Sequence, residues 1–311
     1  MKTDAGLLVV AQPGFMESSM KAFFAARGFS RLWVSGELGL DATIQPPVYD
    51  FFQKEKPAYV ILGSVLSGGI LANTKAPADF IYRNIQSQAN VIYAAWKFGV
   101  RKLIYVGASC MYPAGAAQPI KETSLLTGEL EKTSEPYAVA KIAGVKLCQA
   151  FAAQHNFAVT VIVPATVYGP QGHVDPDNSH VLSALVAKFA TAAAENEKSV
   201  TVWGSGNPRR EFIYIDDFLN AVMLLLEKSE GKGEVYNAGA GEDISIKELT
   251  ALVAKKAGYK GEIQFDTVRP DGAGQKLLDV SRIRQLGFQA SVKLEDGIEK
   301  CFRALKVEQK V

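Results

Sequence analysis

The sequence has few of the features that mark secreted, nucleic-acid-binding or membrane proteins. It contains only three cysteines, Cys110, Cys148 and Cys301, which are far apart and lack the spacing of a disulfide framework or a metal site. It has no block of basic residues, and its net charge of +2 disfavours nucleic acid or a membrane surface as a partner. The apolar run at 7–11 is too short for a signal peptide or a membrane span. We therefore expect a globular protein with reduced thiols in the cytoplasm.

Short apolar runs alternate with longer helical segments along the first half of the chain. Such runs, separated by helices, predict a parallel sheet that is covered on both faces, so the fold class is a doubly wound, Rossmann-like α/β fold. Ligands of this fold bind at the carboxyl ends of the strands. The expected strands lie at 7–11, 31–35, 58–63, 102–108 and 159–164, with notable helices at 78–98 and 136–156.

The regular alternation ends near residue 165, where a Gly-, Pro- and Asp-rich loop begins. We expect a Rossmann-like core over 1–165 that returns at about 211–240, and a smaller lobe made of 166–210 and 241–290. Segments 212–215 and 235–237 are expected to rejoin the main sheet. Residues 291–311 are expected to form a C-terminal helix.

Tyr137 and Lys141 form the first chemical signature. Residues four apart on a helix lie one turn apart on the same face, so the ammonium can lower the pKa of the phenol and hold a cofactor ribose. The phenol can then move a proton at a substrate oxygen. This pair alone is a weak motif, but here it opens a helix that follows a strand ending in GASCMYP.

Several longer segments extend this signature. Together they resemble GDP-L-fucose synthase, a member of the extended short-chain dehydrogenase/reductase family. That resemblance implies a GDP-4-keto-6-deoxy sugar as substrate, epimerisation at C3 and C5, reduction at C4 by NADPH, and a homodimer formed through helices 78–98 and 136–156. The segments are PADFIYRN (77–84), GASCMYP, EPYAVAKIAGVKLC, NSHV, VWGSGNPRREF and RPDGAGQKLLDV.

Epimerisation beside a ketone needs a base on one face of the sugar and an acid on the other. The resemblance assigns Cys110 as the base and His180 as the acid, with Tyr137, Lys141 and Ser109 as further catalytic residues. A nearby cation would lower the pKa of the thiol from its reference value of about 8.5. Taken singly, Cys110 reads as a buried small side chain and His180 as a residue at a helix start, but their place in two separate motifs favours catalysis.

The resemblance also assigns residues to the nucleotide-sugar lobe. A guanidinium fork suits diphosphate oxygens, and Arg210 occupies the family's arginine position, whereas Arg209 has the alternative of being a solvated surface residue. Lys188 stands where an arginine is usual, so the charge is kept without the fork. The substrate-binding residues implied in this way are Asn178, Lys188, Trp203, Arg210 and Lys276.

The first turn departs from the family's GxxGxxG pattern, in which backbone N–H groups hold a pyrophosphate. It begins at Ala11, keeps only Gly14, and has Glu17 at the third glycine position. A carboxylate 4 Å from one phosphate charge costs about 1 kcal/mol in water and about 4 kcal/mol at an effective dielectric near 20. The alternative is that the loop repacks and Glu17 points outward, where it stabilises the helix dipole.

Other departures fall on the same side of the site. The second strand is followed by Glu37 where the family has arginines for a 2′-phosphate, and Ala108 replaces the family's catalytic serine. Thr166 replaces an asparagine, and Ser64 begins a segment that is small and alanine-rich in the family. Gly14 and Lys141 are the remaining cofactor-binding candidates.

These departures lead to three functional hypotheses. The leading one is an epimerase acting at C3, C5 or both on a GDP-4-keto-6-deoxy sugar, with hydride transfer weakened or lost and no cofactor required. The alternative is a full epimerase-reductase that uses NADP(H). The third is a catalytically silent binding subunit, which the presence of Cys110, His180, Tyr137 and Lys141 disfavours.

Overall fold

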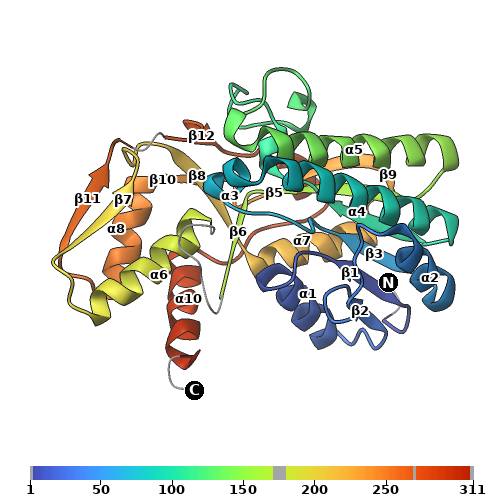
Figure 1. Ribbon diagram of the computed structural model, residues 1–311, viewed down its shortest axis with the longest axis horizontal. Coiled ribbons are helices and arrows are strands. Elements are labelled where there is room, and N and C mark those ends of the chain that lie inside the picture. The colour runs from blue at the N-terminus through green and yellow to red at the C-terminus, as the bar shows by residue number, and fades with distance from the viewer. Residues whose placement is uncertain (1–2, 171–179, 269–270, 309–311) are drawn as a thin grey trace.

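The computed structural model describes residues 3–170, 180–268 and 271–308. Its centre is a six-stranded parallel sheet with the strand order β2-β1-β3-β4-β5-β9, which confirms the expected α/β doubly wound class (Figure 1). The strands of this sheet are β1 (Leu7–Val10), β2 (Leu32–Val34), β3 (Tyr59–Leu62), β4 (Lys102–Val106), β5 (Val159–Pro164) and β9 (Lys232–Ala238).

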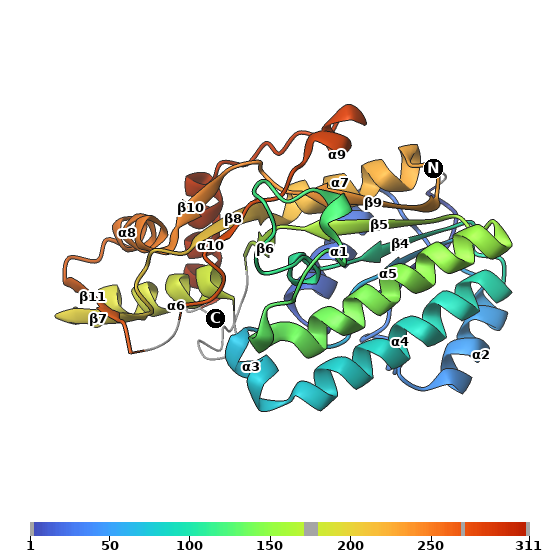
Figure 2. The same cartoon turned by 90° about the horizontal axis from the view of Figure 1, so that it is seen from above.

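Helices cover both faces of the sheet. Figure 2 shows α4 and α5 side by side on one face, with α2 beside α4, while α7 lies on the opposite face and packs against α1. The inner strands are mostly apolar because both of their faces are buried; in β4 all five residues are buried, including Lys102. These helices are α1 (Phe15–Ala26), α2 (Gln45–Glu55), α4 (Pro77–Lys97), α5 (Glu135–His155) and α7 (Ile215–Lys228).

The strand order changes direction between β1 and β3. The chain runs from β1 outward to β2, then returns across β1 to β3 and continues to β4 and β5. At such a reversal the connections leave in opposite directions, so a crevice forms outside the carboxyl ends of the two strands. The residues that follow β1 and β3, beginning at Ala11 and Gly63, lie at this crevice. Between β3 and α4 the chain forms the short helix α3 (Ile70–Lys75).

The second half of the chain adds a lobe beside the sheet (Figure 1). One small sheet has the order β10-β8-β12, with β6 also paired to β8, and a second sheet pairs β11 with β7. The lobe's strands and helices are β6 (Thr166–Tyr168), α6 (Val181–Ala194), β7 (Ser199–Trp203), β8 (Arg209–Tyr214), β10 (Asp243–Ser245), α8 (Ile246–Ala257), β11 (Glu262–Asp266), β12 (Gln275–Lys276) and α10 (Leu294–Glu308). The short helix α9 (Ser281–Gln285) packs instead against β9 of the main sheet.

The expectation that segment 212–215 rejoins the main sheet was wrong. Residues Phe212, Ile213 and Tyr214 lie in β8, which pairs with β6, β10 and β12. Its apolar residues are buried because β8 is central in the smaller sheet, and a short apolar run indicates burial without indicating which sheet provides it. Segment 235–237, by contrast, lies in β9 of the main sheet.

Among the described residues, no helix combines the length and the apolar character needed to cross a membrane.

Candidate active site

Helix α5 approaches β4 closely, and this contact positions the first chemical signature. Gly144 permits the approach, because a Cβ there would overlap the Tyr105 hydroxyl and the Gln88 side chain. Tyr105 Oη donates to Gln88 Oε1 at 2.7 Å, and Gln88 Nε2 donates to the carbonyl of Ala140 at 2.6 Å. The Tyr105 ring is thereby held 4.2 Å from Lys141 Nζ, a cation–π contact.

Lys141 is almost completely buried, with 1% of its surface exposed. Burial lowers the pKa of its ammonium from 10.5 to about 7, and the nearby Cys110 and Cys148 thiols act in the opposite direction. Because the pKa lies near neutrality, this side chain can change charge in the range where enzymes work.

Tyr137 lies one turn before Lys141 on α5, and its ring packs edge-on against Phe80 at a centroid distance of 6.0 Å. Its hydroxyl lies 2.7 Å from Ser64 Oγ, within hydrogen-bond distance. Burial raises the pKa of the phenol, Cys110 raises it further, and the hydrogen bond with Ser64 lowers it. The sequence had presented Ser64 only as a departure from the family, but the structure makes it the hydroxyl partner of Tyr137.

Cys110 follows β4 in the short helix η1 (Ser109–Met111) and is half-buried. Burial raises the pKa of its thiol, and the cations of Lys276 and Lys141 oppose that rise. The expected cations are therefore present, but the expectation that they lower the thiol pKa overall was wrong, because desolvation outweighs them. Tyr137, Lys141 and Lys276 each interact electrostatically with Cys110, so the structure brings them into one region around the thiol.

Lys276 and Arg210 are neighbours across the β12–β8 pairing. Burial lowers the pKa of both side chains, and the carboxylate of Glu131 raises both. Glu131, which sequence reasoning missed, lies just before the short helix η3 (Lys132–Ser134) and accepts hydrogen bonds from Thr133 and Ser134. Its only signal in the sequence was its position ahead of the Tyr137 helix. Two cations and this carboxylate thus share the site with Cys110.

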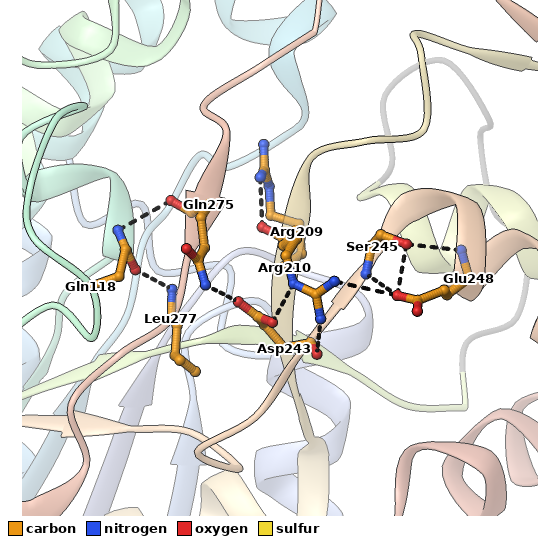
Figure 3. Close-up of polar contacts among 8 residues, drawn as sticks. All are labelled: Gln118, Arg209, Arg210, Asp243, Ser245, Glu248, Gln275 and Leu277. Carbon is orange, nitrogen blue, oxygen red and sulfur yellow. Dashed lines mark hydrogen bonds and ion pairs between the residues drawn. The ribbon is translucent and has the colours of Figure 1, made fainter.

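Arg209 and Arg210 are adjacent in sequence but have different surroundings (Figure 3). Arg209 forms an ion pair with Asp243, with 2.7 Å between Nε and Oδ1, and contacts Glu248 at 3.4 Å, so it stabilises the lobe instead of being simply solvated. Arg210 Nη1 donates to the carbonyls of Arg209 at 2.8 Å and Ala273 at 2.6 Å. Arg210 is the strand partner of Lys276, and the carboxylates of Glu131 and the exposed Asp271 act on its charge.

The same network connects the lobe to the loop before η2 (Glu122–Ser124). Gln275 Nε2 donates to Asp243 at 2.6 Å, and its carbonyl accepts from Gln118 Nε2 at 3.2 Å (Figure 3). Gln118 Oε1 accepts from the backbone N–H of Leu277 at 2.8 Å. These bonds fix both neighbours of Lys276 along the chain, so the position of Lys276 next to Cys110 is well defined.

The remaining residues predicted for the lobe are more dispersed. His180 precedes α6 and is exposed, yet the protein around it lowers the pKa of its imidazole by desolvation. Lys188, further along α6, donates from Nζ to the carbonyl of Thr201 at 2.6 Å. Trp203 ends β7 and is 47% exposed, an unusual surface position for an indole. Asn178 lies outside the described residues. The pairing of His180 with Cys110 stays a prediction.

Glu17 adopts neither of the two orientations considered from the sequence. It is 6% exposed, and its carboxylate reaches from α1 to the end of β2. There it accepts hydrogen bonds from Gly36 N at 2.7 Å and Ser35 Oγ at 3.0 Å. Its charge is therefore satisfied by donors at the end of β2 instead of being directed at the pyrophosphate position or at solvent.

Gly14 keeps the conformation that a phosphate-binding turn requires. It is the residue before α1, with φ of 112°, and a Cβ there would meet open space. The backbone at this helix N-terminus is accessible to an anion. Beside it, Gln12 Oε1 accepts from Ser67 N at 2.7 Å and Ser67 Oγ at 2.8 Å, which connects the first turn to the loop after β3.

Two other departures follow the neighbouring strands β4 and β5 of the main sheet. Ala108 ends in extended backbone immediately before η1. The adjacent Ser109 contributes its carbonyl oxygen to a hydrogen bond from Tyr112 N at 3.3 Å. Thr166 lies in β6, opposite Phe212 of β8. Within the part of the chain that the structure describes, no group of three or more His, Cys, Asp or Glu side chains could hold a metal.

Comparison with known proteins gives consistent results. The sequence profile of the NAD dependent epimerase/dehydratase family matches residues 32–239. GDP-L-fucose synthase 1 of Arabidopsis thaliana is 42% identical over 299 residues, covering 96% of this chain and 92% of that protein. GDP-L-fucose synthase of Escherichia coli K12 is 40% identical over 305 residues, covering 96% and 95%. A solved GDP-mannoheptose C4 reductase of Campylobacter jejuni with NADP bound is 32% identical, with a TM-score of 0.87 and coverage of 98% and 99%.

These relatives correct one expectation from the sequence. A reaction that requires no cofactor was predicted from the departures at Ala11, Glu17 and Ala108. It is contradicted by relatives named as synthases and by a similar reductase that holds NADP. The physical argument failed because it assumed that Glu17 faces the pyrophosphate, whereas the carboxylate is bonded to the end of β2.

Proposed function

We propose, from the premise that this chain belongs to the NAD dependent epimerase/dehydratase family, that it is an epimerase-reductase of a GDP-linked 4-keto sugar that uses NADP(H). The chain is a nucleotide-sugar enzyme of the extended short-chain dehydrogenase type, with GDP-L-fucose synthases as homologues. The observation that carries the proposal is the region shared by Cys110, Tyr137, Lys141 and Lys276, because it combines a thiol for proton abstraction with a Tyr–Lys pair for reduction.

Cys110 is proposed to remove the protons next to the ketone. Its thiol is poorly acidic on its own because burial raises its pKa, but Lys276 and Lys141 stabilise the thiolate. A negative charge that develops on the C4 oxygen as the proton leaves would be stabilised by Tyr137 Oη and the Lys141 cation. His180 is proposed to return a proton from the opposite face of the sugar, after which the second carbon can react in the same way.

The described residues fit a dinucleotide at its pyrophosphate and nicotinamide ends. The open backbone around Gly14 would hold the pyrophosphate, and Lys141 and Tyr137 would hold the nicotinamide ribose. When bound, NADPH supplies a hydride to C4. Tyr137 then delivers its phenolic proton to the C4 oxygen, and the neighbouring Lys141 cation stabilises the phenolate that remains.

The lobe is proposed to bind the GDP moiety. Arg210 and Lys276 supply positive charge for the diphosphate, and Lys188 adds a third cation from α6. The half-exposed Trp203 side chain is proposed to contact the base.

One assay with GDP-4-keto-6-deoxy-mannose tests both halves of the reaction. The protein is incubated with this sugar in D₂O, without and then with NADPH, and deuterium at C3 and C5 is followed together with NADPH consumption. We expect exchange in both conditions and reduction when NADPH is present. Exchange without any NADPH consumption would contradict the reductase half, and the absence of both signals would contradict the proposal as a whole.

We also infer that the protein is a homodimer joined through α4 and α5. Tyr82 on α4 is 61% exposed and Val139 on α5 is 38% exposed, so apolar side chains extend from two helices that lie side by side (Figure 2). Light scattering should give twice the chain mass, and Tyr82→Glu should give a monomer. A monomeric wild type would contradict this inference.

A further inference from the structure

Ser64 occupies a position from which it can act on Tyr137. Its Oγ lies 2.7 Å from Tyr137 Oη, and either oxygen can be the donor. The two residues are 73 positions apart in the sequence and come from different elements, the carboxyl end of β3 and the start of α5. The hydrogen bond therefore depends on the packing of α5 over the sheet, not on local chain geometry.

The backbone around Ser64 is fixed on two sides. The carbonyl of Ser64 accepts from Gln12 N at 2.7 Å, which ties it to the turn after β1 at the reversal point of the sheet. Two residues later, the carbonyl of Leu66 accepts from Asn84 Nδ2 of α4 at 2.8 Å, and Asn84 is buried. The backbone that carries the Ser64 hydroxyl is thus fixed by the protein itself, which reduces the cost of placing the hydroxyl beside Tyr137.

Ser109 and Ser64 are both candidates for the serine that acts on Tyr137. Position 108, where the resemblance expects a serine, is alanine, and Ser109 is its neighbour. Ser109 is in η1, where it contributes its carbonyl to Tyr112 N. Ser64 instead directs its side-chain oxygen at the phenol, so the geometry favours Ser64.

We propose that Ser64 is the positioning residue for Tyr137, a role that rests on the proposed function and deepens it. Its hydroxyl orients the phenol toward the C4 oxygen of the keto-sugar. After Tyr137 has transferred its phenolic proton to that oxygen, the Ser64 hydroxyl keeps its proton and donates a hydrogen bond to the phenolate. The Lys141 cation, one helical turn away, stabilises the same charge.

The first test compares serine variants in the reduction assay. Ser64→Ala should lower kcat by about tenfold to a hundredfold, as expected for a hydrogen bond to a charged group, while KM for the GDP-sugar changes by less than about threefold. Ser64→Thr keeps the hydroxyl and should restore most of the rate. Ser67→Ala is the matched control, because its hydroxyl lies in the same loop but bonds to Gln12. Ser64→Ala within twofold of wild type, or a larger loss in Ser109→Ala, would overturn the proposal.

A second test detects the hydrogen bond between Ser64 and Tyr137 independently of catalysis. A difluorotyrosine, which is more acidic than tyrosine, is placed at position 137 and its phenol is titrated by ¹⁹F NMR. Ser64→Ala should raise the pKa of this phenol, because the lost hydrogen bond stabilised the phenolate. Ser67→Ala should leave it unchanged. An unchanged pKa in Ser64→Ala would reject the positioning role even if the enzyme reduces its substrate, and a wild type without activity would reject only the proposed function.

Discussion

Glu17 and Lys141 are both buried ionisable side chains on helices beside the same sheet, but their surroundings differ. The Glu17 carboxylate accepts hydrogen bonds from Gly36 N and Ser35 Oγ, so its charge is stabilised where it lies. Lys141 is even more buried. Its ammonium lies over the face of the Tyr105 ring and near the thiols of Cys110 and Cys148. Burial consequently lowers its pKa to about 7.

The difference separates a structural role from a chemical one. A buried charge with good donors adds to the stability of the fold, whereas one that is poorly compensated lowers stability and is kept because it does chemistry. By this reasoning the first turn and β2 form a stable framework, and the Cys110–Tyr137–Lys141 region is the reactive part. Five predictions test this contrast.

Replacing Lys141 should have the largest effect and should act on activity and stability in opposite directions. Lys141→Met should lower the reduction rate by about 10²- to 10⁴-fold, since the phenol loses its cation. Near neutral pH the free energy of unfolding of the variant should nevertheless be higher than that of the wild type, by on the order of 2 to 4 kcal/mol, because the substitution removes a buried charge. Lys146→Met, an exposed lysine on the same helix, is the control.

The pH dependence of unfolding tests whether burial of the Lys141 charge destabilises the fold. Because the pKa of Lys141 falls from 10.5 to about 7 on folding, the unfolded chain binds more protons between these values. The free energy of unfolding of the wild type should therefore increase as pH rises from about 7 to about 10. Lys141→Met should not show this increase. Urea titrations across this range measure it, and identical pH profiles for the two proteins would contradict the assignment.

Removing the thiol should abolish proton exchange while leaving the fold intact. Cys110→Ser should reduce deuterium incorporation at C3 and C5 by about a hundredfold or more. In the wild type, the rate of exchange should increase with pH, because burial raises the pKa of the thiol and the thiolate is the base. Cys301→Ala, in α10, serves as the control thiol. Normal exchange in Cys110→Ser would remove Cys110 from its assigned role.

The two adjacent arginines allow a matched comparison in the lobe. Arg210→Gln should raise KM for the GDP-sugar by about tenfold, because a charge close to Lys276 is lost from the diphosphate site. Arg209→Gln should change KM by less than about threefold and instead slightly lower the stability of the lobe, because Arg209 is paired with Asp243. Equal KM changes in both variants would contradict the distinction.

The smallest effect is expected at Glu17. Glu17→Gln removes the charge that Gly36 N and Ser35 Oγ stabilise, so it should lower the free energy of unfolding by on the order of 1 kcal/mol and change NADP binding by less than about twofold. Glu37→Gln should have less effect, because that carboxylate is exposed and paired with Lys21. Calorimetry of the two variants measures the difference. Weaker binding in Glu17→Gln would show that the carboxylate supports the cofactor site.

Much of the main sheet could be predicted because its pattern is local. Continuous apolar runs identified β1, β3, β4 and β5, and the spacing of Tyr137 and Lys141 placed both on one face of α5. The same reasoning failed at β8, because burial in a small second sheet produces the same apolar run as burial in the main one. It also failed for the cofactor, because substitution in the first turn suggested a conflict that the folded chain resolves.

The contacts that define the candidate site lay beyond sequence reasoning. From the sequence, Ser64 was only one of the departures from the family pattern. Its hydroxyl comes within hydrogen-bond distance of Tyr137 only because α5 packs over the end of β3. Glu131 gave no signal of its own, and its influence on Lys276 and Arg210 depends on how the lobe packs. The thiol pKa had the opposite direction from the one expected, because the extent of burial was unknown.

By itself, the sequence determined which elements form, which helix carries the tyrosine and lysine, and which family the chain belongs to, since these follow from local periodicity and from contiguous motifs. Only the tertiary structure decided that Glu17 bonds to the end of β2, that Ser64 meets Tyr137, and that burial outweighs the cations around Cys110. Hydrogen bonds and desolvation depend on distances between residues remote in the chain, and those distances exist only once the sheet and the lobe have packed.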